Sequence, residues 1–181
     1  MIQPLNDNDD FKVYPTRFLV VILFALVQMM TSVLMNTLTP VAAYLSEIYQ
    51  EDPVVVNLGS LLFALMHPIF TFPAAYFIDT YGSRIGITIG CALCLFGTCL
   101  RLLVNQGFAW VIVGQIIAGI GRPFILNCQA KISASWFKAD TRGAVTQYLT
   151  LIMNVSLILG FFIPSIVFGG YNLEKDNPAS I

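Results

Sequence analysis

A few polar and charged side chains stand inside stretches that are otherwise almost wholly apolar. Arg122 is the most unusual of them, because it is a charge about eight residues, or roughly 12 Å of helix, away from the nearest charged loop. A guanidinium at that depth marks either a functional site or a side chain that reaches back toward the headgroups or ties helices together. Candidate partners are Asp79, Asn36, Asn127 and Asn154.

Uncharged polar residues interrupt other apolar stretches. Asn36 stands near Thr37 and Thr39, and Asn154 stands near Ser156. Buried polar groups in a membrane either bond across helices or line a wet cavity. If the protein is a transporter, we expect four residues to bind the solute: Asn36, Gln115, Arg122 and Asn154.

Residue types for covalent or metal chemistry are sparse. His67 is the single histidine and precedes Pro68, so it is either a packing residue or a proton-relay group. Cys91 and Cys94 form a CxxC within an apolar stretch, with no second CxxC, which is typical of small packing residues. We therefore expect no catalytic residues, no metal site and no cofactor.

Composition places the chain in a membrane. Of its 181 residues 57% are hydrophobic and 10% are charged. A soluble domain carries about 25% charged residues, so the lipid bilayer is the expected surrounding. The net charge of −1 says nothing about nucleic acid, and because no basic patch is present we expect no nucleic-acid partner.

Five stretches reach the ~20 residues needed to cross a bilayer as helices. We predict an all-α polytopic membrane protein with a polar tail (1–17), a five-helix bundle (18–168) and a second polar tail (169–181). Pro40 is expected to bend the far end of the first span. The predicted spans are Phe18–Tyr44, Asn57–Ile78, Ile85–Val104, Phe108–Ala130 and Ala144–Phe168.

Basic residues predict the orientation. Arg101 and Lys175 fall on one side, while six fall on the other: Lys12, Arg17, Arg84, Lys131, Lys138 and Arg142. The first tail holds three Asp and no apolar core, so we expect no signal peptide. The N-terminus and the loop 79–84 are expected in the cytosol, or in the matrix of an organelle, and the C-terminus on the opposite side.

The stretch FPAAYFIDTYGSRIG, residues 72–86, joins the second and third spans through a charged loop of about six residues, Asp79–Arg84. So short a loop makes the two helices antiparallel neighbours. Its D-x-x-G-x-R pattern resembles the loop between helices 2 and 3 of major facilitator superfamily transporters. With Thr80, and with GQIIAGIGRPFILNCQAKISASWF at 114–137, it is similar to the feline leukaemia virus subgroup C receptor family of choline and haem-related transporters.

The resemblance implies two six-helix bundles with the solute bound between them. It also implies that Asp79, Gly82 and Arg84 form a conformational latch with a helix N-terminus of the second bundle. Two departures oppose a cationic solute: Arg122 replaces an uncharged polar residue, and Met35 replaces a Trp that would stack on the substrate.

The chain ends after the fifth span, so two functions stay open. We expect a transporter-derived protein that no longer transports and serves as an accessory subunit of a larger membrane complex, for example one in an organelle's inner membrane. The alternative is the N-terminal half of a working transporter for a small organic solute, choline-like or other. Both need further membrane chains or a second bundle as partners.

Overall fold

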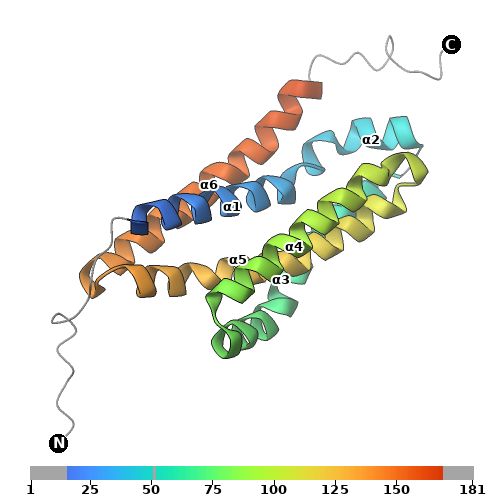
Figure 1. Ribbon diagram of the computed structural model, residues 1–181. Helices are drawn as coiled ribbons and strands as arrows, with labels where there is room; N and C mark the ends of the chain where they lie inside the picture. The colour runs from blue at the N-terminus through green and yellow to red at the C-terminus, as the bar shows by residue number, and fades with distance from the viewer. Residues whose placement is uncertain (1–15, 51, 169–181) are drawn as a thin grey trace, which may run out of the picture.

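The computed structural model describes residues 16–50 and 52–168, and every regular element within them is a helix. Figure 1 shows the long helices running roughly alongside one another. Five spans are long and apolar enough to cross a membrane, which confirms the all-α polytopic prediction. The helices are α1 (Thr16–Asn36), α2 (Ala42–Tyr49), α3 (Pro53–Tyr81), α4 (Ser83–Arg101), α5 (Ala109–Trp136) and α6 (Ala139–Phe168), with 3₁₀ turns η1 (Thr39–Val41) and η2 (Leu102–Gln106).

The helices run further than the predicted spans, and the predicted six-residue loop Asp79–Arg84 is wrong. Only Gly82 separates α3 from α4, with φ 90° and ψ 160°, a conformation that favours glycine. Its N–H donates to the Ile78 carbonyl at 3.0 Å and so caps α3. The predicted tails 1–17 and 169–181 lie outside the described residues, apart from Thr16 and Arg17 in α1.

The first span is broken rather than merely bent. α1 ends at Asn36, η1 carries Pro40, and α2 then continues to Tyr49. Proline cannot donate the N–H that a continuous helix would need at that position, which explains the break. The predicted disturbance at Pro40 is confirmed, and it places Thr37 and Leu38 between two helical pieces.

α5 is the central helix. Half of its most apolar stretch is buried, against 11% for α6. It packs along α3 and α4 and also touches α1 and α6. Small residues allow the close approach to α4, since a Cβ added at Gly121 would lie 2.7 Å from the Gly90 carbonyl oxygen.

α1 lies along α6, as Figure 1 shows in blue and orange. Gly160 makes this approach possible, because a Cβ there would lie 3.0 Å from the Val33 carbonyl oxygen. α1, α3, α5 and α6 therefore surround one region of the bundle interior, while α4 packs on α5 and α3.

Candidate solute site

Arg122 sits at the midpoint of α5, with a side chain that is only 6% exposed. Its Nη1 donates to the Thr31 carbonyl oxygen across a long 3.5 Å, and its guanidinium lies 5.8 Å from the centre of the Phe63 ring. Within residues 16–50 and 52–168, no carboxylate lies within 4.0 Å of it. The charge is thus held by one weak hydrogen bond and one cation–π contact, which leaves it able to attract an anion.

A pocket of about 310 Å³ opens beside this guanidinium. Four spans contribute to it, and His67, Arg122 and Met153 each lie within one residue of the midpoint of their helices. The pocket is therefore at the middle of the predicted membrane thickness. Its lining residues are Met35, Phe63, Ala64, His67, Arg122, Leu126 and Met153.

The remaining predicted solute residues are not in this lining. Asn36 is half-buried near Gly160, whose added Cβ would lie 3.4 Å from the Asn36 Cβ. Asn154 is exposed on α6. Gln115 is completely buried on α5, and neither its Oε1 nor its Nε2 has a hydrogen-bond partner. The structure thus brings Arg122 alone, of the four, to the pocket.

A polar seam joins α1 and α5 at Arg122 and Gln129. Gln115, Arg122 and Gln129 are spaced by seven residues, so they share one face of α5. Gln28 of α1 donates to Gln129 Oε1 at 2.9 Å, and both side chains are buried. Gln129 in turn donates to the Thr146 carbonyl and to Thr150 Oγ1 of α6, each at 2.9 Å.

This seam was not recognised in the sequence, although its seven-residue spacing was available. Its bonds join three helices where apolar contacts alone would not fix their register. Gln28 Oε1 and Ser32 Oγ are buried without hydrogen-bond partners. Both residues are near Thr31 on α1, whose carbonyl oxygen accepts the bond from Arg122. α1 and α5 are therefore held together by polar groups that lead to the pocket.

The predicted latch residues lie at the α3–α4 turn. Asp79 forms an ion pair with Lys131 of α5 at 2.5 Å, and Lys131 also donates to the Ile78 carbonyl at 3.0 Å. Arg84 is exposed at the start of α4. Asp79, considered above as a counter-charge for Arg122, is instead paired with Lys131, which the sequence reasoning had used only to assign orientation.

Metal-binding chemistry finds no support in the described part of the chain, where no group of three His, Cys, Asp or Glu could hold an ion. Cys91, Cys94, Cys99 and Cys128 are free thiols. Cys94 and Cys128 are buried and contact backbone carbonyls of neighbouring helices, as packing residues do.

Comparisons with known proteins agree on one family. The model of the Major Facilitator Superfamily matches residues 22–173. The choline/ethanolamine transporter FLVCR1 of Mus musculus is 23% identical over 155 residues, 84% of this chain and 28% of that protein. Human choline/ethanolamine transporter FLVCR2 is 23% identical over 164 residues (90% and 31%), and solute carrier family 49 member A3 of Xenopus tropicalis is 24% identical over 173 (90% and 36%). The chain thus spans about a third of the length of these relatives.

Proposed function

Because this chain belongs to the major facilitator superfamily, we propose that it supplies one half of a solute-binding cavity in a membrane transporter. Transporters of this architecture bind their solute near the bilayer midplane, between two bundles. The observation that carries the proposal is the mid-helix pocket, where a buried arginine has no carboxylate partner among the described residues. The second bundle would come from another chain or from a longer product.

A small organic anion is the solute that this pocket favours. An incompletely compensated guanidinium in a low-dielectric setting attracts carboxylate or phosphate and repels ammonium groups. The two mammalian relatives are named as choline/ethanolamine transporters, whose solutes are cations. Arg122 and Met35, the two residues that oppose a cation, both line this pocket. A choline-like solute is the competing outcome.

A second candidate is the accessory subunit that does not transport. The observation that favours it is the Asp79–Lys131 ion pair, because Asp79 is already bonded within its own bundle. A second bundle is then not required to compensate this carboxylate. Purification in mild detergent would test it: co-migration with a large complex supports this candidate, and a dimer or a single transporter-sized species opposes it.

The latch and the orientation belong to the transporter proposal. Asp79, Gly82 and Arg84 would meet the second bundle at the turn between α3 and α4, and Asp79 would have to exchange Lys131 for that contact. The excess of Lys and Arg near this turn supports its cytosolic or matrix placement. Asn36 and Gln115 would face the solute only in a state in which the helices have moved, whereas Asn154 is already exposed on α6.

Thermal unfolding of the purified protein in detergent tests the solute class. We expect at least one carboxylate or phosphate compound from a panel of small metabolites to raise the unfolding midpoint, whereas choline does not. The rise should disappear in Arg122→Gln and persist in Arg84→Gln, which removes an exposed arginine of the same type. Stabilisation by choline, or an anion effect that survives Arg122→Gln, would overturn the proposal.

A further inference from the structure

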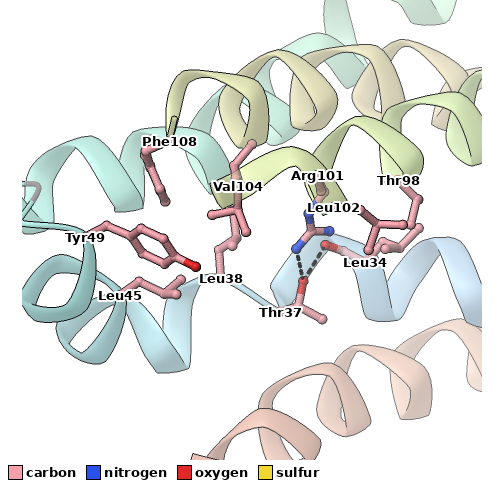
Figure 2. A pocket seen from close by; sticks show the side chains of 11 residues that line it. Leu34, Thr37, Leu38, Leu45, Tyr49, Thr98, Arg101, Leu102, Val104 and Phe108 are labelled. Carbon is pink, nitrogen blue, oxygen red and sulfur yellow. Dashed lines mark hydrogen bonds between the residues drawn. The ribbon is translucent and has the colours of Figure 1, made fainter. Parts of the chain in front are cut away.

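A second pocket, of about 360 Å³, lies at the end of the bundle opposite the Gly82 turn. Figure 2 shows it between the broken first span and the connection from α4 to α5. None of its lining residues lines the Arg122 pocket. It is therefore a separate feature, which the proposed solute site does not explain.

The walls of this pocket are largely apolar. Leu34, Leu38, Leu45, Val104 and Phe108 project into it in Figure 2. The Tyr49 ring lies 6.3 Å from that of Phe108 and extends the same wall. Such a surface suits a hydrocarbon chain rather than a water-soluble metabolite.

Arg101 is the only charged residue among those that line the pocket. Its Nη2 donates to Thr37 Oγ1 at 2.9 Å, and that hydroxyl donates to the Leu34 carbonyl at 3.1 Å, as the dashed lines in Figure 2 mark. In the described part of the chain no carboxylate lies within 4.0 Å of Arg101. A guanidinium has five N–H donors, so it can hold a phosphate while keeping the bond to Thr37.

The pocket lies at the level of a membrane surface. α4 continues through η2 to Gln106, the chain turns at Gly107, and α5 begins at Ala109, so this connection must lie at a bilayer face. Trp110, 42% exposed, is placed as an interfacial anchor. Leu102, at the edge of the pocket, is 76% exposed and so accessible from outside.

We propose that this pocket binds a phospholipid, with the phosphate on Arg101 and one acyl chain against the apolar wall. Both parts of the ligand are needed, because a free phosphate would leave the wall uncovered and a neutral diacylglycerol would leave the guanidinium unpaired. Glu47 on α2 and Asp52 immediately before α3 lie near the same end of the bundle. Because these carboxylates repel anions, the proposed binding depends on short-range hydrogen bonds from Arg101 to the phosphate and not on a general attraction of anions.

Native mass spectrometry of the delipidated protein in detergent, with added lipid, tests this. We expect phosphatidylglycerol adducts to exceed diacylglycerol adducts, and Arg101→Gln to reduce them about tenfold. Arg84→Gln is the matched control, because it removes an exposed arginine from the other end of the same helix. Leu102→Trp, at an exposed edge position, should hinder the acyl chain and lower adducts without an effect on folding.

Three outcomes would overturn the proposal. Equal adducts with diacylglycerol would show that the phosphate is not recognised. Equal losses in Arg101→Gln and Arg84→Gln would show non-specific electrostatics. Protection of the thermal midpoint by inorganic phosphate alone, unaffected by Leu102→Trp, would show an ion site with no lipid. Arg122→Gln should leave lipid adducts unchanged, which separates this proposal from the solute site.

Discussion

At the scale of single residues, the question is why a membrane helix retains Arg122. The side chain is buried at mid-helix, and its contacts are a 3.5 Å bond to a carbonyl and an aromatic face 5.8 Å away. Neither contact offsets the cost of removing a guanidinium from water. Ligand binding, the role that we propose for Arg122, would account for a side chain that is costly to the fold and lines a cavity.

Arg122→Met should therefore stabilise the protein. Replacing a poorly compensated buried charge with an apolar side chain of similar length is expected to raise the free energy of unfolding by roughly 1 kcal/mol. Denaturation with sodium dodecyl sulfate in mixed micelles measures it, and Arg84→Met should change it by less than about 0.5 kcal/mol. A decrease in the free energy of unfolding of more than about 2 kcal/mol would instead show that the contacts of Arg122 stabilise the packing of the helices.

The Asp79–Lys131 pair should contribute little to stability despite its 2.5 Å separation. Its side chains are 68% and 37% exposed, so solvent and salt screen the interaction. A double-mutant cycle with Asp79→Asn and Lys131→Gln should give a coupling free energy below about 1 kcal/mol, smaller in high salt. A larger, salt-independent coupling would mean that the latch is locked within this bundle.

The sequence was enough to single out Arg122 as a charge deep within a span, but it predicted only part of the surroundings of that side chain. Arg122 stands out because no other charge falls so deep within a span, and the seven-residue spacing to Gln115 and Gln129 could have been read as a helix face. That Gln28 meets Gln129 could not, since their contact joins residues 101 positions apart. Such pairings depend on which helices pack together.

At the scale of elements, the α3–α4 turn is determined by one glycine. An L-residue at φ 90° is strained, so Gly82→Ala should lower the free energy of unfolding by about 1 kcal/mol or more. Gly143→Ala is the control: it lies inside α6 with open space around its Cβ position, and it should stabilise by roughly 0.5–1 kcal/mol. Urea or detergent titration measures both, and equal effects would contradict this account of the turn.

The contact between α4 and α5 should be as sensitive to a glycine-to-alanine substitution as the Gly82 turn is. A Cβ at Gly121 would meet the backbone oxygen of Gly90 at 2.7 Å, and backbone cannot move aside as a side chain can. Gly121→Ala should lower the free energy of unfolding by about 1–3 kcal/mol. Retention of the wild-type thermal midpoint by this variant would show that α4 and α5 pack less closely than this 2.7 Å approach requires.

The presence of each helix could be predicted from the length of its apolar stretch, whereas the residues at which the helices end could not. The loop was predicted to span six residues, Asp79–Arg84, because the stretch is polar and charged, yet Asp79 and Arg84 lie within helices that project past the apolar part of each span. Gly82 and Pro40 were the reliable local signals, since one permits a reversal and the other prevents continuation.

At the scale of the whole molecule, the chain is a five-span bundle whose α1, α3, α5 and α6 meet at a pocket near mid-membrane. The composition alone predicted the membrane. That α1 would pack along α6 and α3 along α5 depends on long-range contacts, which no local pattern encodes. The bundle corresponds to about a third of the length of its relatives, and under the proposed function its pocket would form one wall of a cavity shared with a second bundle.

The central claim, a water-accessible pocket with a positive potential from Arg122, is tested most directly by charged thiol reagents. Met153→Cys would be made in a protein whose four cysteines, Cys91, Cys94, Cys99 and Cys128, are replaced by Ala, and its modification rates measured with methanethiosulfonate reagents bearing a sulfonate or a trimethylammonium group. With each rate divided by that reagent's rate with a free thiol in solution, we predict relatively faster reaction with the sulfonate, and loss of that preference in Arg122→Gln. A normalised preference for the trimethylammonium reagent while Arg122 is present would contradict a positive potential in this pocket.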